Sequence, residues 1–154
     1  MLSALRFPKP PANPRLPDGV RIYAISDIHG CAHLLERMLA VIDADVAHSR
    51  PCRAIEVFLG DYIDRGPDSR STLDLLIRRA RGGNAVFLKG NHEAFLAEVF
   101  LDPSRISDWF RLGARPHAGS QCGDFGKRGQ HDTGACATGN LTLLSIEGNR
   151  LLAI

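Results

Sequence analysis

Three short polar runs, each directly after a strand-like apolar stretch, constrain the fold of this 154-residue chain most strongly. The apolar stretches are rich in the β-branched and aromatic residues that favour strands; they are Arg21–Ser26, Ala54–Leu59 and Ala85–Leu88. The polar runs that follow are Asp27-Ile28-His29-Gly30, Gly60-Asp61-Tyr62-Ile63-Asp64-Arg65-Gly66 and Gly90-Asn91-His92-Glu93. Each strand is therefore expected to deliver polar side chains at its carboxyl end.

The segments between these strands have the spacing of amphipathic helices. Apolar residues recur on one helical face in Ala32–Val46 and in Ser71–Arg81. A third helix is expected from His92 to about Leu101, because Pro103 stops it. Alternating strands and helices predict an α/β fold with parallel strands and right-handed crossovers. Ligands of such sheets bind outside the carboxyl ends of the strands, so the three polar runs should share one edge.

The side chains of the three runs offer oxygen and nitrogen donors without a thiolate. Carboxylates, imidazoles and a carboxamide suit Mn²⁺, Fe or Zn²⁺, and two such ions about 3.5–4 Å apart can clamp the attacking and leaving oxygens of a phosphoryl displacement. Taken singly, each run has a structural alternative, since Asp27 or Asn91 could cap a helix and Glu93 would be favourable in its first turn. All three runs in this order favour a two-metal site that cleaves phosphate esters.

The runs resemble the signature blocks of the calcineurin-like metallophosphoesterases, and most closely those of the bacterial serine/threonine protein phosphatase branch. The best match is the stretch GDYIDRGPDS at residues 60–69. Diadenosine tetraphosphate hydrolases are similar to this branch and share most of the blocks. The resemblance implies a metallophosphoesterase-type βαβαβ half-sandwich with parallel strands. Leu141–Ile146 and Arg150–Ile154 are expected to add a C-terminal β-hairpin.

The resemblance also implies a role for each polar residue. Asp27 and His29 would bind a first metal, Asp61 would bridge both metals, and Asn91 would bind the second. His92 would be the general acid, Asp64 would orient it, and Arg65 would hold the substrate phosphate. The chemistry of these side chains agrees with the roles, because a carboxylate has two oxygens with which to bridge, a histidine beside a carboxylate can supply a proton, and a guanidinium can bind phosphate in a bidentate way.

The second half of the chain departs from the family pattern. Full-length relatives supply further metal-binding histidines there, in a His-Ala-Gly block and a Gly-His-Thr block. His117-Ala118-Gly119 has the letters of the first block, but Arg111–Pro116 before it is no buried strand, so we do not expect His117 to be that ligand. The resemblance resumes at Asp132–Gly148, while Gly113–His131 matches no block and is expected to be a loop. The chain thus resembles a family member that lacks an internal segment.

Composition indicates one globular domain, with 44% hydrophobic residues. We expect a proline-rich N-terminal arm at 1–19 and a single, incomplete phosphoesterase domain at 20–154. The formal net charge of +2 does not indicate a nucleic-acid or membrane partner, and no stretch approaches the roughly 20 apolar residues that span a bilayer. The four cysteines form no Cys-x-x-Cys pair and are expected to be reduced thiols of a cytoplasmic protein.

The function predicted from these observations is that of a serine/threonine protein phosphatase-like enzyme that hydrolyses phosphate monoesters with a metal-bound hydroxide. Its cofactors would be two divalent ions, Mn²⁺ in the first place, with Fe or Zn²⁺ as alternatives. Its substrate would be a phosphorylated protein or a small phosphoester. Two other functions stay open: a dinucleoside-polyphosphate hydrolase on the same scaffold, and a catalytically crippled remnant that only binds metal or a partner.

Overall fold

The computed structural model describes residues 13–111, 113–114 and 135–153. The strands are β1 (Val20–Ile25), β2 (Arg53–Phe58), β3 (Ala85–Phe87), β4 (Leu143–Glu147) and β5 (Arg150–Ala153). The helices are α1 (Ala32–His48), α2 (Ser69–Ala80), α3 (Asn91–Leu101), α4 (Ile106–Arg111) and α5 (Ala135–Thr138), with a 3₁₀ turn at Pro103–Arg105. The predicted βαβαβ order and the C-terminal hairpin are confirmed.

All five strands form one sheet in the order β3-β2-β1-β4-β5. β1 pairs with β2, and β2 with β3, in parallel, while β4 pairs antiparallel with β1. Ile25, Phe58 and Phe87 are register partners in the last residues of their strands. The three parallel strands therefore end at the same level, and the loops that follow them start side by side.

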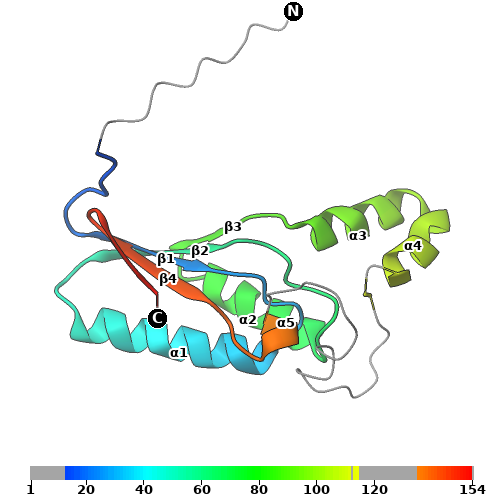
Figure 1. Ribbon diagram of the computed structural model, residues 1–154, viewed down its shortest axis with the longest axis horizontal. Coiled ribbons are helices and arrows are strands. Elements are labelled where there is room, and N and C mark those ends of the chain that lie inside the picture. Colours follow the sequence, from blue (N-terminus) through cyan, green and yellow to red (C-terminus); the bar gives the residue numbers. More distant parts are fainter. Residues whose placement is uncertain (1–12, 112, 115–134, 154) are drawn as a thin grey trace, which may run out of the picture.

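The hydrophobic core lies between the sheet and the helices α1 and α2, which cover one face (Figure 1). Tyr23, Ile25 and Phe58 point to this face and are fully buried, as the alternation of side chains along a strand requires. Leu35 and Ile42, seven residues apart on α1, complete the core from the helix side. The predicted apolar stripe of α1 thus faces the core as expected. The stripe predicted on α2 does so only in part, because Leu76 is buried whereas Leu73 and Ile77 are 39% and 55% exposed.

The other face of the sheet is also apolar, but no helix of the described residues lies over it (Figure 1). By alternation it carries Ile22 and Val57, which are half-buried, and Val86 and Leu151, which are exposed. Parallel sheets whose strands are apolar on both faces are normally covered by a layer on each face. The single helical layer agrees with the half-sandwich predicted from the sequence.

A buried ion pair ties the sheet to the helical layer. Glu56 on β2 is 7% exposed, and Arg79 on α2 donates to both of its carboxylate oxygens, at 2.7 and 2.6 Å. Arg79 also reaches the exposed Asp43 on α1 at 2.6 Å. One guanidinium therefore links β2, α1 and α2.

We expect Arg79→Leu to lower the free energy of unfolding by about 3 kcal/mol, because it leaves the Glu56 carboxylate buried and unpaired. Asp43→Ala is the matched control: it removes only the exposed partner, and should change stability by less than about 1 kcal/mol. Urea denaturation of the three proteins measures both effects. Equal losses of unfolding free energy in the two variants would show that the buried ion pair contributes no more to stability than the exposed one.

The start of α2 and the state of one cysteine differ from the predictions. α2 begins at Ser69 rather than Ser71, because the Asp68 carboxylate accepts a hydrogen bond from the Ser71 N–H at 2.9 Å and caps the helix. The expectation of four reduced thiols is wrong for Cys31, which is disulfide-bonded, whereas Cys52 is a free thiol. Cysteine chemistry therefore no longer supports the expected cytoplasmic location.

Two other sequence predictions are not tested by this structure. Residues 1–12 of the predicted arm lie outside the described residues, as do residues 115–131 of the predicted loop with His117. Among the helices that the structure describes, none combines the length and the apolar character needed to cross a membrane.

Candidate metal centre

The loops after β1 and β2 bring three predicted metal ligands together. One ligand atom each from Asp27, His29 and Asp61 lies within 4.8 Å of the other two. Asp27 and Asp61 are partly accessible, and His29 is 1% exposed. Residues that are 34 positions apart in the sequence thus form one small cluster at the carboxyl edge of the sheet, where the strand pattern predicted it.

His29 is held in the form that can bind a metal ion. Its Nδ1 lies 3.0 Å from the carbonyl oxygen of Ile63, and since a carbonyl can only accept, Nδ1 carries the hydrogen. The lone pair of the neutral ring is then on Nε2. Burial lowers the pKa of His29 below its ordinary value, which keeps the ring neutral at pH 7. A backbone carbonyl on the far nitrogen is the usual second partner of a metal-binding histidine.

Asn91, the first residue of α3, extends the cluster toward β3. Its side-chain amide lies beside the Asp61 carboxylate, with the amide nitrogen 2.9 Å from Oδ2. The backbone N–H of the next residue, His92, donates to Oδ1 of Asp61 at 3.0 Å. Asp61 is therefore the described residue that contacts both the Asp27–His29 side and the Asn91 side of the site.

His92 lies beside this cluster, and the two nitrogens of its ring have different surroundings. Its Nδ1 is 2.8 Å from Oδ2 of Asp64, and its ring meets the His29 ring edge to face at 4.7 Å between centroids. The other nitrogen, Nε2, is buried and has no hydrogen-bond partner among the residues that the structure describes. A buried polar atom without a partner is costly and calls for an explanation, and a bound substrate or its leaving oxygen would supply one.

Asp64 is itself fixed by a residue that the sequence did not indicate. The indole N–H of Trp109, on α4, donates to Oδ2 of Asp64 at 2.8 Å. This carboxylate oxygen therefore accepts hydrogen bonds from both His92 and Trp109. The Asp64 side chain is buried, at 7% exposed. The pair lies 45 positions apart, and no local pattern announces a contact at that separation.

Glu93, like Trp109, has a role in the site that the sequence did not predict. Its carboxylate accepts hydrogen bonds from the backbone N–H groups of Asp61 at 2.9 Å, Tyr62 at 2.8 Å and Gly90 at 3.0 Å. One side chain thus ties the loop after β2 to the start of α3. Its role is to hold the ligand-bearing loops together, beyond the favourable placement at a helix start that its position alone suggested.

Backbone strain is concentrated in these loops. The described non-glycine residues with positive φ are His29 (46°), Asp61 (51°), Asp64 (69°) and Arg65 (62°), and all four belong to the polar runs. Such conformations are costly and gather at functional sites. Gly90 is required for another reason, because a Cβ there would lie 2.1 Å from Oδ1 of Asp61.

Arg65 lies next to Asp64 in the same loop. Its backbone N–H donates to the carbonyl of Gly113 at 3.1 Å, and its positive charge is close enough to His29 to contribute to the lowered pKa of that ring. A guanidinium at this place can meet an anion that approaches the cluster.

The donor set fits one divalent ion well and a second one in part. Two carboxylates and a neutral imidazole are common ligands of Mn²⁺, Fe and Zn²⁺, and Asp27, His29 and Asp61 provide them. For a second ion, the residues predicted from the sequence within the described ranges are Asp61 and Asn91. The described part of the chain therefore brings together most of the donors that one divalent ion needs, and some of the donors for a second.

Comparison with known proteins points the same way. A family model described as calcineurin-like phosphoesterase matches residues 20–150. A symmetrical bis(5'-nucleosyl)-tetraphosphatase of Methylococcus capsulatus is 39% identical over 85 residues, which are 55% of this chain and 28% of that protein. An asymmetrical bis(5'-nucleosyl)-tetraphosphatase of Anoxybacillus flavithermus is 36% identical over 80 residues, which are 50% of this chain and 33% of that protein.

Among solved structures, one is of a protein proposed to be a diadenosine tetraphosphatase. The alignment covers 62% of this chain and 39% of that protein's chain, at 30% identity and a TM-score of 0.44. The matched part of the chain spans only about a quarter to a third of the two sequence relatives, at 28% and 33% of their lengths.

Proposed function

The chain belongs to the calcineurin-like phosphoesterase family, and on this basis we propose that it is a metal-dependent phosphoesterase that acts on dinucleoside polyphosphates. The observation that carries the proposal is the Nε2 of His92, which lies beside the Asp27, His29 and Asp61 cluster and is buried without a hydrogen-bond partner in the described part of the chain. The relatives support the dinucleotide alternative over the protein-phosphatase function expected from the sequence, because those described above are bis(5'-nucleosyl)-tetraphosphatases.

Asp27, His29 and Asp61 would hold a first ion, and Asp61 together with Asn91 would hold a second. Divalent ions at these places would lower the pKa of a coordinated water and neutralise charge on the phosphate. The protein fixes the donors beforehand: the Ile63 carbonyl sets the tautomer of His29, and Glu93 holds the backbone of Asp61. Ligands that are positioned before binding need no reorganisation when the substrate arrives.

His92 would serve the leaving group. With Nδ1 bound to Asp64, its Nε2 is the atom that can deliver a proton to the departing oxygen. Asp64 would stabilise the charged ring and keep it oriented, and Trp109 would keep Asp64 in place through the indole N–H. The nucleotide phosphate that leaves from an anhydride is a weaker base than the alkoxide that leaves from phosphoserine. Hydrolysis of a dinucleoside polyphosphate therefore depends less on protonation of the leaving group by His92.

Arg65 would bind a phosphate oxygen of the substrate. Its guanidinium has the planar set of donors that matches a phosphate, and it follows Asp61 and Asp64 in one strained loop. A polyphosphate chain offers several anionic groups near the reacting phosphorus, and hence more contacts for an arginine here than a phosphomonoester does.

The proposal is tested by incubating the purified chain and Mn²⁺ with bis(5'-adenosyl) tetraphosphate, a phosphoserine peptide or p-nitrophenyl phosphate. We expect the dinucleotide to be cleaved fastest; ADP alone as product indicates symmetrical cleavage, and ATP with AMP indicates asymmetrical cleavage. We expect a rate far below that of the intact Methylococcus capsulatus relative, because the second ion has few ligands in the described residues. Faster hydrolysis of the phosphopeptide would instead support the protein-phosphatase function. Mn²⁺ binding without any hydrolysis would support the third alternative, a catalytically inactive protein that only binds metal.

A further inference from the structure

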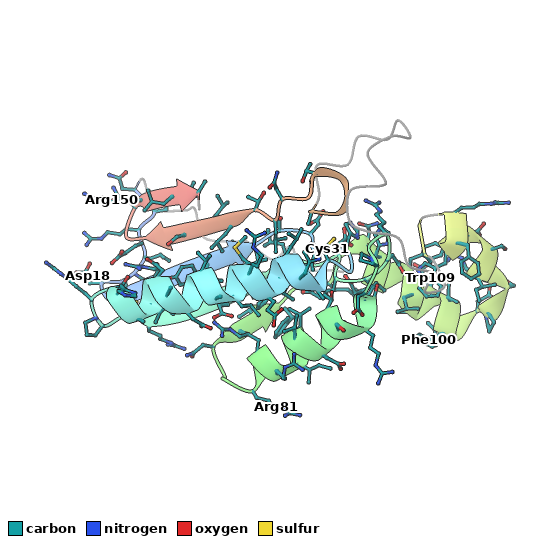
Figure 2. The ribbon with its side chains drawn as sticks, turned by 90° about the horizontal axis from the view of Figure 1, so that it is seen from below. Asp18, Cys31, Arg81, Phe100, Trp109 and Arg150 are labelled. Carbon is teal, nitrogen blue, oxygen red and sulfur yellow. The ribbon has the colours of Figure 1, made fainter. Side chains whose placement is uncertain are left out.

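A second charged site lies at the opposite end of the sheet from the metal centre. A cavity of about 520 Å³ opens between the segment before β1, the end of α1 and the β4–β5 turn. Four arginines line it: Arg15, Arg21, Arg50 and Arg150. Figure 2 shows Asp18 and Arg150 together at this end, and Trp109 of the metal centre at the far end. The six residues of β1 separate the two places, a length of about 20 Å.

The acidic residues that line the cavity are already paired. Glu147 accepts from Arg21 at 2.6 Å, and Arg21 is held in addition by Asp45 of α1 at 2.7 Å. Asp18 pairs with Arg15, three positions away. No carboxylate that lines the cavity is thus left to neutralise a further cation.

Two of the four arginines have no carboxylate partner within the described ranges, so their positive charges can pair with an anionic ligand. Arg50, after α1, and Arg150, at the start of β5, are exposed and form no ion pair within the described ranges. Arg15 can join them, because its pair with Asp18 is highly exposed, and exposed pairs are weak enough for a stronger anion to displace. The cavity therefore presents at least two uncompensated guanidinium groups, brought together from segments 100 residues apart.

We propose that this cavity binds a diphosphate-bearing anion, either inorganic pyrophosphate or the diphosphate of a nucleotide, through Arg50 and Arg150. Two unpaired positive charges match an anion with two or more negative charges, and the planar guanidinium fork fits phosphate oxygens in a bidentate way. The volume is within the range of small-molecule sites, and admits a mononucleotide. This site is separate from the metal centre and does not depend on the proposed catalytic function.

Calorimetric titration of the whole chain with pyrophosphate or ADP, in the presence of EDTA, tests the proposal without metal-mediated phosphate binding. We expect one binding event, weakened about tenfold to a hundredfold in the double variant Arg50→Ala/Arg150→Ala, since each lost contact is a charge-assisted hydrogen bond. The control is Arg78→Ala/Arg81→Ala, which removes the same charge at the end of α2, away from the cavity (Figure 2). It should bind like the parent.

Comparing pyrophosphate with ADP distinguishes a site for inorganic pyrophosphate from a site for a nucleotide. Equal affinities mean that the diphosphate alone is recognised, and tighter binding of ADP means that the cavity also contacts the nucleoside; either result supports the proposal. Mn²⁺ titration of Arg50→Ala/Arg150→Ala should match the parent, which shows that the metal centre and the fold are intact. No binding by the parent at millimolar ligand, or equal affinities in the two double variants, would overturn the proposal.

Discussion

Asp61→Asn is expected to weaken Mn²⁺ binding more than substitution of any other residue of the site. Asp61 shares the candidate metal cluster with Asp27 and His29, and its carboxylate also lies 2.9 Å from the amide of Asn91. In the proposed centre this one residue would serve both ions. Loss of a residue that only hydrogen-bonds to a metal ligand typically costs about 10–100-fold in metal affinity, so loss of the bridging carboxylate should cost more than about 100-fold.

The asparagine substitution isolates the metal-binding role, because it keeps an oxygen that can accept from the His92 N–H, as Oδ1 of Asp61 does at 3.0 Å. Calorimetric titration with Mn²⁺ gives the affinity and the stoichiometry. Asp74→Asn is the matched control: Asp74 lies on α2, with only a 4.0 Å ion pair to Arg70. A parent-like affinity and stoichiometry in Asp61→Asn would refute the bridge.

His92→Asn is expected to lower the hydrolysis rate by about 10²–10⁴-fold, the usual contribution of a general acid. The asparagine amide can still donate to Asp64, as Nδ1 of His92 does at 2.8 Å, but it has no counterpart of Nε2. The loss should be larger for a phosphoserine peptide than for a dinucleoside tetraphosphate, because a departing alkoxide needs the proton more. Steady-state kcat on both substrates measures the difference.

Two controls accompany this variant. His48→Asn changes an exposed histidine at the end of α1, whose Nδ1 lies 2.7 Å from the Ala44 carbonyl, and should leave the rate unchanged. Mn²⁺ affinity should be the same in His92→Asn as in the parent, since His92 is not among the proposed ligands. A parent-like kcat in His92→Asn would exclude its role as proton donor.

The sheet and its ligand edge could be predicted from sequence because their signals are local. An apolar β-branched stretch predicts a strand by itself, and the polar run after it predicts where its side chains emerge. Parallel pairing then follows from the helices between the strands. These steps placed Asp27, His29 and Asp61 at one edge, and the structure brings their ligand atoms together within 4.8 Å.

The remaining parts of the site depend on contacts between distant residues. Trp109 reaches Asp64 only because α4 turns back after Pro103, and a six-residue helix gives no periodicity from which its orientation could be inferred. The bonds that Glu93 accepts from the backbone N–H groups of Asp61 and Tyr62 depend on the conformation of the loop after β2, where Asp61 and Asp64 have positive φ. Residue types alone do not predict such conformations for non-glycine residues.

Anomalous scattering from crystals of the chain soaked in Mn²⁺ tests the proposed metal centre most directly. An anomalous peak is expected about 2.2 Å from carboxylate oxygens of Asp27 and Asp61 and from Nε2 of His29. A second, weaker peak is expected between Asp61 and Asn91. Well-ordered crystals that bind Mn²⁺ elsewhere, or that show no peak at Asp61, would contradict a phosphoesterase metal centre in this chain.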